Sequence, residues 1–322
     1  MKLLVTGGAG YIGSVVTHAL LDAGHTVTVL DDLSTGHIDN VPSQAEFIKG
    51  DIANVGSVLT PEFDGVLHFA ARIAAGESVV KPELYWDTNV RGSLALLEAV
   101  RHCRTARLVF SSTAAVYGSS DTAITENTPT GPTNPYGASK LAVDMMITGE
   151  CGASGLGAVS LRYFNAAGAV TSNNRLLGER HDPETHLIPI AIEAAAGARP
   201  ALQMFGDDYD TPDGTCVRDY IHVSDLAEAH LLALNAATPG EHKIYNLGTG
   251  HGYSNKQVVD VIRAVTGREL PVTMAPRREG DAVTVVAAAD KAREELNWKP
   301  RKGKLEDIIA DAWSFYQNFQ AK

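Results

Sequence analysis

The chain has 322 residues, of which 44% are hydrophobic and 20% charged, and it carries a formal net charge of −11 at pH 7. This length suits one large or two medium domains, and the composition is that of an ordinary globular protein. The acidic excess repels polyphosphates and anionic surfaces at long range, so we expect neither nucleic acid nor a membrane as a partner.

The first 165 residues alternate strand-like with helix-like segments. Apolar residues with helical spacing predict helices over 14–24 and 88–103. Short apolar runs that end in glycine or in small polar residues predict strands over 2–8, 25–32, 47–52, 65–71 and 106–112. This rhythm predicts an α/β fold with a doubly wound parallel sheet, in which ligands bind beyond the carboxyl ends of the strands.

The rhythm changes in the second half of the chain. Residues 170–186 are polar and are predicted to form a loop, and glycine and proline punctuate 197–214. Further helices are predicted at 187–196, 224–236, 254–266 and 304–320. We therefore expect two domains, over residues 1–165 and 166–322, the second a smaller α/β unit with some segments that return to the first.

The cysteines indicate the compartment. Cys103, Cys151 and Cys216 lie far apart and are odd in number, which does not suggest a disulfide framework. The first apolar run is too short for a signal peptide, and no stretch approaches the roughly 18 apolar residues of a membrane span. We expect a protein of the reducing cytoplasm.

A glycine-rich loop, "TGGAGYIGS" at residues 6–14, connects the first predicted strand to the first helix. Gly7, Gly10 and Gly13 let the backbone turn tightly and approach a pyrophosphate, while the helix N-terminus offers free N–H groups. Asp31 ends the second strand, where a carboxylate accepts hydrogen bonds from the adenosine ribose and repels a 2′-phosphate. Because residues 31–40 contain no lysine or arginine, we expect a site for NAD rather than NADP, and not a plain glycine turn.

Tyr136 and Lys140 lie four positions apart, so on a helix that begins near Pro135 they share one face. Lys140 and the positive ring of an oxidised nicotinamide both favour phenolate, which lowers the tyrosine pKa toward neutrality. A phenolate can take the proton of a sugar or alcohol hydroxyl while hydride leaves the same carbon. Thr113, at the end of a strand, can position or relay that proton. The alternatives are a solvated pair on a surface helix and a strand-end cap.

The motifs of the two halves together resemble the extended short-chain dehydrogenase/reductase family, and within it the nucleotide-sugar 4-epimerases. They cover nearly the whole chain and include "TGGAGYIGS", "HFAA", "SSTAAVYG", "YGASK", "LRYFN", "GTCVRDYIHV", "YNLGTG" and "PRREGD". The resemblance implies a Rossmann-type fold, a homodimer and an isomerase that interconverts UDP-galactose and UDP-glucose through a 4-keto sugar with tightly held NAD. The spacings alone imply no more than an NAD-dependent sugar or alcohol oxidoreductase.

The resemblance also implies residue roles. Tyr136 is the base and Lys140 its electrostatic partner, which also reaches the nicotinamide ribose. The other implied cofactor contacts are Tyr11 and Ile12 at the pyrophosphate, Asp51 and Ile52 at the adenine, Phe69, Ala70, Ala71 and Asn89 along the cofactor, and Phe164 beside the nicotinamide. The implied substrate contacts are Thr113, Tyr136 and Val285 near the sugar, Asn165, Arg218 and Arg278 at the diphosphate, Leu187, Phe205 and Asp281 at the uridine, and Tyr220 in the same pocket.

Guanidinium groups bind phosphates bidentately, so Arg218 and Arg278 suit an otherwise acidic protein. For the neighbouring Arg277 we expect a surface ion pair instead.

Two positions depart from the family pattern. Arg72 and Ile73 stand where some members carry a lysine contact to the cofactor. Val285 stands where large aromatic residues are associated with rejection of N-acetylated sugars, so we hypothesise some activity on UDP-GlcNAc and UDP-GalNAc.

His181, Asp182, Glu184 and His186 lie close together in "GERHDPETH" at 178–186. A metal site is conceivable there. The proline and the polar context favour an ordered substrate loop, so we expect no metal.

Three other functions remain to be weighed. A nucleotide-sugar 4,6-dehydratase needs an acid and a base where this chain has Thr113, Ala114 and Ala115. An NAD-dependent nucleotide-sugar dehydrogenase with net redox chemistry would accumulate NADH. A non-catalytic NAD-sensing protein would have no use for an intact set of threonine, tyrosine and lysine.

Overall fold

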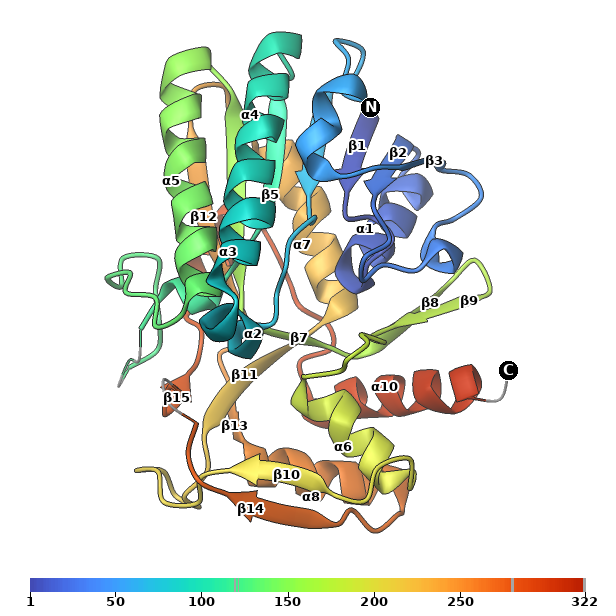
Figure 1. Cartoon of the computed structure of the whole chain (residues 1–322), viewed down its shortest axis with the longest axis vertical. Coiled ribbons are helices and arrows are strands. Elements are labelled where there is room, and N and C mark those ends of the chain that lie inside the picture. Colours follow the sequence, from blue (N-terminus) through green and yellow to red (C-terminus); the bar gives the residue numbers. More distant parts are fainter. Residues whose placement is uncertain (119, 121, 279–280, 321–322) are drawn as a thin grey trace.

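The computed structural model describes residues 1–118, 120, 122–278 and 281–320. Its main element is a parallel seven-stranded sheet with the strand order β12-β6-β5-β4-β1-β2-β3 (Figure 1). The strands are β1 (Lys2–Thr6), β2 (Thr26–Asp31), β3 (Glu46–Lys49), β4 (Gly65–His68), β5 (Arg107–Thr113), β6 (Gly157–Tyr163) and β12 (His242–Leu247). The predicted Rossmann-type sheet is confirmed, and its order reverses between β1 and β4, where such sheets bind ligands.

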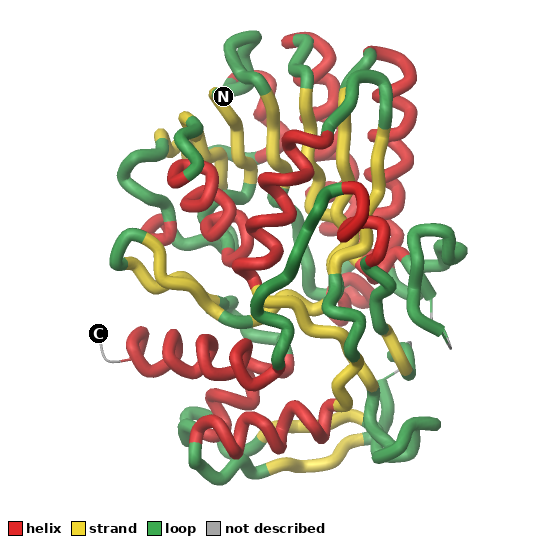
Figure 2. The backbone as a smooth tube through the Cα atoms, turned by 180° about the vertical axis from the view of Figure 1, so that it is seen from behind, coloured by secondary structure: helices red, strands yellow, loops and turns green. Residues whose placement is uncertain are grey.

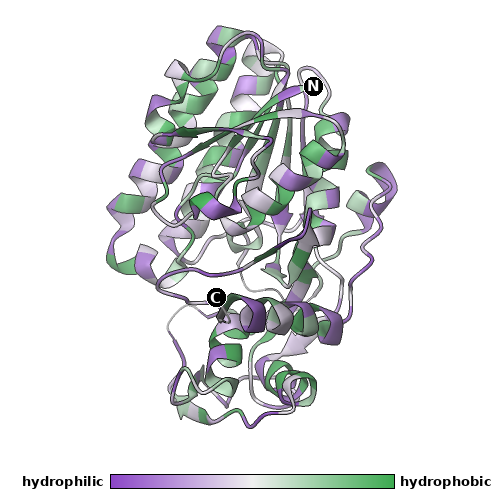
Figure 3. Cartoon of the chain, turned by 90° about the vertical axis from the view of Figure 1, so that its right-hand side faces the viewer, coloured by the Kyte–Doolittle hydropathy of each residue, from purple (hydrophilic) through white to green (hydrophobic). Residues whose placement is uncertain are grey.

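Helices cover both faces of the large sheet because its strands turn apolar side chains to both sides. In β1, Leu3 and Val5 face one layer and Leu4 faces the other. The first layer holds α1 (Tyr11–Asp22) and α7 (Val223–Ala236), and the second holds α4 (Gly92–Cys103) and α5 (Pro135–Ser154). Figure 3 shows hydrophobic strands between helices whose outer surfaces are more hydrophilic. The shorter segments of this half are η1 (Ile38–Asn40), η2 (Ile52–Ser57), α2 (Ala75–Val80), α3 (Pro82–Tyr85), η3 (Trp86–Arg91) and η4 (Ala114–Val116).

Most of the second half forms a smaller α/β unit below the large sheet in Figure 1. At its centre β11 pairs with β7, β13 and β15, and a second, two-stranded sheet joins β10 to β14. The elements are β7 (Asn165–Ala167), α6 (Leu187–Ala195), β10 (Leu202–Phe205), β11 (Val217–His222), β13 (Gly252–Ser254), α8 (Asn255–Thr266), β14 (Val272–Ala275), β15 (Thr284–Val285) and α10 (Leu305–Gln320). The helices predicted in this half are confirmed to within a residue or so at each end.

Three elements of the second half join the large sheet and its helical layers. β12 pairs with β6 along its whole length, α7 packs beside α1, and α9 (Asp290–Glu295) packs against β12. A domain boundary between residues 165 and 166 stays a prediction. None of the helices in the described part of the chain combines the length and apolar character that a bilayer span requires.

The loop predicted over 170–186 contains an antiparallel hairpin, so that prediction was wrong for its first part. β8 (Ala169–Ser172) pairs with β9 (Arg175–Gly178), and Figure 2 shows the two strands above the C-terminal helix. The turn residues Asn173 and Asn174 have φ angles of 48° and 61°. Asparagine tolerates the left-handed backbone that tight hairpin turns require, which explains how a polar segment forms strands.

Candidate active site

The glycine loop turns the chain from β1 into α1. Gly7 has a φ of 74°, and its N–H donates to the Leu30 carbonyl at 2.8 Å. A Cβ on Gly13 would lie 2.2 Å from the Gly7 oxygen, and one on Gly7 would lie 2.5 Å from the Ala70 nitrogen. Only glycine therefore lets α1 start this close to β1 and β4.

The start of α1 can receive a phosphate. Gly10 is the N-cap residue, no side chain of the described residues caps it, and the first turn holds no acidic residue. The first N–H groups of a helix attract anions, because they lack backbone partners and lie at the positive end of the helix dipole. Tyr11 and Ile12 begin this helix, as a pyrophosphate contact requires. The loop thus fits a dinucleotide.

Asp31, the last residue of β2, is held against the glycine loop. Its carboxylate accepts the N–H of Ala9 at 2.9 Å and of Leu33 at 2.8 Å, and the residue is 8% exposed. Burial raises the pKa of Asp31 above its usual value, and the two N–H groups oppose that shift. The carboxylate is thus fixed beside the loop where the ribose of a dinucleotide would lie.

Replacing Asp31 by asparagine is expected to weaken NAD binding roughly 10- to 100-fold, because a hydrogen bond to a charged group contributes about 1.5–3 kcal/mol. The preference for NAD over NADP should shrink at the same time, since the repulsion of a 2′-phosphate is removed. Equilibrium dialysis of cofactor-stripped protein against each nucleotide measures both effects. Asp32→Asn is the matched control, because Asp32 is exposed and only caps the Ser34 N–H. An unchanged NAD/NADP ratio in Asp31→Asn would assign cofactor selection elsewhere.

The predicted adenine contacts follow β3. Asp51 caps η2 by accepting the N–H of Ala53 at 2.7 Å and is exposed, whereas Ile52 is 7% exposed. A Cβ on Gly92, at the start of α4, would lie 2.6 Å from the Ile52 side chain. Glycine at that position lets Ile52 sit directly against α4, which fixes the edge where an adenine would stack.

The segment after β4 carries Phe69, Ala70 and Ala71, all partly buried. Asn89, predicted to line the cofactor, is 2% exposed and anchors this segment: Oδ1 accepts the Arg72 N–H at 2.8 Å and Nδ2 donates to the Arg72 carbonyl at 3.1 Å. Nδ2 also donates to Ser139 Oγ at 2.9 Å. Asn89 therefore links the β4 segment to α5, while the Arg72 side chain lies 3.7 Å from Glu77.

Tyr136 lies at the start of α5, next to the end of β5. Asn134 caps this helix by accepting the N–H of Gly137 at 2.9 Å. A Cβ on Gly137 would lie 2.1 Å from the Ala115 carbonyl oxygen, so glycine lets α5 begin in contact with η4. This contact places Tyr136 near the end of β5, where Thr113 lies. Burial raises the pKa of Tyr136, and a hydrogen bond from Thr113 acts in the opposite direction.

Lys140 lies beneath the same helix start and is 2% exposed. Its ammonium donates to the Ser111 carbonyl at 2.8 Å and lies 4.7 Å from the centre of the Phe110 ring. Burial lowers the Lys140 pKa to about 7 against the effect of Asp144. The prediction that Lys140 and an oxidised nicotinamide together lower the Tyr136 pKa stays a prediction. Among the protein groups, burial is the largest cause and raises this pKa, and Lys140 is directed to a backbone carbonyl.

Four predicted substrate residues share one face of the small sheet. β11 pairs in register with β7 and β15, so that Tyr220 lies opposite Asn165, and Arg218 opposite Val285. Paired residues point to the same side of a sheet, and Arg218 and Tyr220 are two residues apart. Val285 also packs against the apolar cluster that contains Ala114 and Phe164, next to Thr113. The small sheet around β11 thus places its predicted substrate residues next to the region of Thr113 and Tyr136.

A second group of predicted substrate residues lies at the end of β10. The Arg278 guanidinium lies 4.7 Å from the centre of the Phe205 ring, and its Nε donates to Asp281 at 2.9 Å. The neighbouring Arg277 pairs with Asp208 at 2.6 Å on the surface, as predicted. Glu279 and Gly280, between Arg278 and Asp281, lie outside the described residues. Leu187 is the first residue of α6.

Comparison with known proteins decides the family. The model of the NAD dependent epimerase/dehydratase family matches residues 3–248. The chain belongs to this family. A UDP-glucose 4-epimerase of Streptomyces lividans is 56% identical over 323 residues, which covers 98% of this chain and 96% of that relative. Like the other members of the NAD dependent epimerase/dehydratase family, the chain is therefore an NAD-dependent enzyme, as the glycine loop and Asp31 predicted.

Solved structures of similar proteins agree with this fold and cofactor. A UDP-glucose 4-epimerase from Brucella ovis in complex with NAD is 44% identical, with a TM-score of 0.92 and 98% of each chain covered. One from Bifidobacterium longum in complex with NAD+ and UDP is 37% identical, with a TM-score of 0.91 and 99% of this chain and 98% of that chain covered.

The sequence analysis did not predict one buried network of ion pairs and hydrogen bonds in this protein. Asp144, one turn after Lys140 on α5, pairs with Arg162 of β6 at 2.9 Å, and both side chains are almost fully buried. Arg162 also donates to the Tyr117 hydroxyl at 2.9 Å, which donates to Asn246 of β12 at 2.8 Å. The sequence signal that could have shown this network is a carboxylate one turn after Lys140, on the helix face that also carries Val143 and Ile147.

Proposed function

We propose that the chain is a UDP-glucose 4-epimerase that interconverts UDP-galactose and UDP-glucose with an NAD molecule that it retains. The observation that carries this proposal is the start of α5 against the end of β5: Gly137 lets the helix begin at the Ala115 carbonyl, and the buried Lys140 ammonium, one turn after Tyr136, donates to the Ser111 carbonyl at 2.8 Å. The relatives that cover nearly the whole chain bear this name and support the choice of substrate. The alternatives are another NAD-dependent nucleotide-sugar epimerase or a net-redox dehydrogenase of the same family.

Residues of β11 and of the region after β10 and β14 bind the nucleotide. Arg218 and Arg278 neutralise the two phosphates, Asp281 accepts the uridine ribose hydroxyls, and Phe205 lies beside the uridine. The sugar end is held more loosely between Val285 and Tyr136. Binding energy from the nucleotide therefore leaves the hexose free to present either face.

Tyr136 moves the proton. The chemistry that bound NAD supplies is reversible hydride transfer at C4 of the hexose, through a 4-keto sugar. Tyr136 takes the C4 hydroxyl proton and later returns it, with Thr113 holding the phenol oxygen in place. Because burial raises the Tyr136 pKa, the phenol needs a positive charge beside it to act near neutral pH, and an oxidised nicotinamide ring carries one.

Incubation of the purified protein with UDP-galactose and no added NAD tests the proposal. We expect UDP-glucose to form without accumulation of NADH, because each hydride removed is returned. Chromatography of the nucleotide sugars and absorbance of NADH are the two readouts. Net NADH formation would instead favour the dehydrogenase, and no product of either kind would remove both.

We infer that Val285 admits N-acetylated sugars, so UDP-GlcNAc and UDP-GalNAc should be interconverted at a measurable rate. Val285→Tyr should suppress that activity at least ~10-fold, as expected for loss of a fitting pocket, and should spare UDP-galactose. Chromatography of the products measures both rates. Thr284→Tyr is the matched control, since the neighbouring strand residue points to the other face. Equal effects on both sugar classes would contradict a selective role for Val285.

We also infer that the protein forms a homodimer through α4 and α5. Leu94 of α4 and Met145 of α5 are 48% and 68% exposed, on helices that lie side by side in Figure 1. Large exposed apolar side chains favour a protein contact. Light scattering measures the molar mass.

We infer a reducing cytoplasm as the compartment of the protein. Cys103, Cys151 and Cys216 are free and buried, which suits a reducing compartment.

A further inference from the structure

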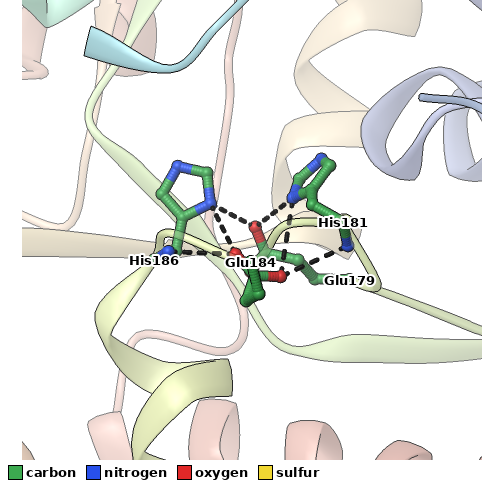
Figure 4. A group of neighbouring side chains, drawn as sticks. All are labelled: Glu179, His181, Glu184 and His186. Atoms are coloured by element: carbon green, nitrogen blue, oxygen red, sulfur yellow. Dashed lines mark hydrogen bonds and ion pairs between the residues drawn. The ribbon is translucent and has the colours of Figure 1, made fainter. Parts of the chain in front are cut away.

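The segment between β9 and α6 gathers two imidazoles and two carboxylates at one point. They belong to Glu179, His181, Glu184 and His186, and one ligand atom of each lies within 4.8 Å of all the others. Figure 4 shows the two imidazole rings on either side of the two carboxylates. The sequence had grouped Asp182 with this set. Asp182 is exposed and outside the cluster, and Glu179 takes its place.

The separations suit a shared ion. Nδ1 of His181 lies 3.2 Å from Glu179 Oε1 and 3.6 Å from Glu184 Oε2. Nδ1 of His186 lies 2.6 Å from Glu179 Oε1 and 3.5 Å from Glu184 Oε1. A tetrahedral ion with bonds of about 2.0–2.1 Å holds its ligands about 3.3 Å apart. The two His181 distances and the His186–Glu184 distance lie near that value, with different Glu184 oxygens facing the two imidazoles, and all four ligand atoms lie within 4.8 Å of one another.

Hydrogen bonds within the protein already hold the side chains of the cluster in place without a metal ion. Glu184 is buried, and its carboxylate accepts the N–H groups of His181 at 3.3 Å, Thr185 at 2.7 Å and His186 at 2.9 Å. Nδ1 of His181 is buried and makes no hydrogen bond to any described residue, although two carboxylates lie near it. A buried nitrogen without a hydrogen bond, directed at two carboxylates, calls for a partner, and a metal ion would supply one.

We propose that Glu179, His181, Glu184 and His186 bind one divalent transition-metal ion, with Zn²⁺ the best fit. Two imidazole nitrogens and two carboxylate oxygens are ligands that Zn²⁺ accepts in tetrahedral geometry. The ion's two positive charges balance the two carboxylates. Ca²⁺ and Mg²⁺ fit less well, because they require six or more oxygen ligands and avoid nitrogen.

An ion can reach this site. A cavity of about 280 Å³ lies between the segment, α6 and α10, and its lining includes Glu179, His181 and Glu184. The opposite wall is largely aromatic, with Phe315 and Phe319 of α10. The cluster is thus open to the cavity on one side.

The position of the site gives the ion a structural role. Arg180, inside the segment, pairs with Asp39, and its carbonyl oxygen lies 3.0 Å from Nε2 of His37, after β2. His186 is the N-cap residue of α6, directly before Leu187. An ion that holds both ends of the segment would therefore tie the cofactor half of the molecule to the helix that begins the substrate side.

The alternative is that the cluster closes as two imidazolium–carboxylate pairs without a metal. Burial lowers the pKa of His181, but Glu179 and Glu184 outweigh it and raise the pKa to about 9. Protons therefore compete with a metal for the same nitrogens, and direct metal binding has to decide between the two arrangements.

The test uses the full-length protein with its NAD. After treatment with a chelator and metal-free gel filtration, ZnCl₂ is titrated by calorimetry and the bound zinc is counted by mass spectrometry. We expect one zinc per chain and an unfolding temperature that rises with zinc. His186→Gln and the isosteric Glu179→Gln should each weaken zinc binding roughly 100-fold or more, since each removes one of four ligands. MgCl₂ and CaCl₂ should not displace the zinc.

Asp182→Asn is the matched control, because it removes an exposed acid from the same segment but no ligand. It should bind zinc as the unchanged protein does. Unchanged NAD content in all variants shows that they fold. Zinc binding that is substoichiometric, or equally strong in His186→Gln and Glu179→Gln, would overturn the site and assign the cluster to ion pairs. None of these readouts depends on epimerase activity, so either proposal can fail without the other.

Discussion

Tyr136→Phe is expected to lower the turnover of UDP-galactose by about 100- to 10,000-fold, the range that general acid–base catalysis supplies. The change removes one oxygen and keeps the ring. That ring packs edge-on against Tyr85, with 6.4 Å between the ring centres. UDP binds through Arg218 and Arg278 in our proposal, so its dissociation constant should stay nearly unchanged. Steady-state kinetics and UDP titration of the same preparation measure the two quantities.

Tyr85→Phe is the matched control for this experiment. Tyr85 is a buried neighbouring phenol, but its hydroxyl donates to the Ala74 carbonyl at 2.6 Å and has no part in the proposed chemistry. Its turnover should stay within a few-fold of the unchanged protein. If Tyr136→Phe kept comparable turnover, Tyr136 would not be the base. A parallel loss of UDP affinity would indicate that the tyrosine supports the structure instead.

Asp144→Ala is expected to lower the free energy of unfolding by about 3–5 kcal/mol, the usual cost of removing one partner from a buried ion pair. Arg162 would keep its charge inside the protein, since its side chain is 5% exposed. Among the described residues, the Tyr117 hydroxyl would remain as its polar side-chain partner. Chemical denaturation at saturating NAD measures the difference.

Asp87→Ala serves as the control for this prediction. Asp87 pairs with Arg91 at 2.5 Å, but both side chains are more than half exposed, so the loss of unfolding free energy should be much smaller than for Asp144→Ala. Replacing both buried partners, Asp144→Leu with Arg162→Met, should recover part of the stability, because no charge is left buried. Equal effects of Asp144→Ala and Asp87→Ala would contradict the buried network.

The sequence predicted those features that local patterns encode. The strands and helices of the first half follow from apolar spacing, and the glycine loop predicted a backbone turn that a Cβ at Gly13 would block. Asp31 was assigned because its role follows from its place at the end of a strand. The surface ion pair of Arg277 was also predicted. Arg278 forms an exposed ion pair too, with Asp281, and its phosphate contact stays a prediction.

Structural features that depend on contacts between distant segments could not be predicted from local sequence patterns. Tyr136 packs against Tyr85 of α3, and burial raises its pKa, an effect that the local pattern around Tyr136 does not reveal. Glu179 joins its cluster only because the β8–β9 hairpin delivers it there, and the hairpin itself was hidden in a polar run. The partner of Asp144 lies on a strand that begins after α5 ends.

The placement of β12 bears on how the protein is made. A nascent chain that has reached residue 165 has every strand of the large sheet except this one, and it also lacks α7. The edge of β6 would be open to pairing with other chains, and the apolar surface beside α1 would be uncovered. A fragment cut at that point is therefore expected to aggregate rather than fold, even though it carries the whole glycine loop and Tyr136.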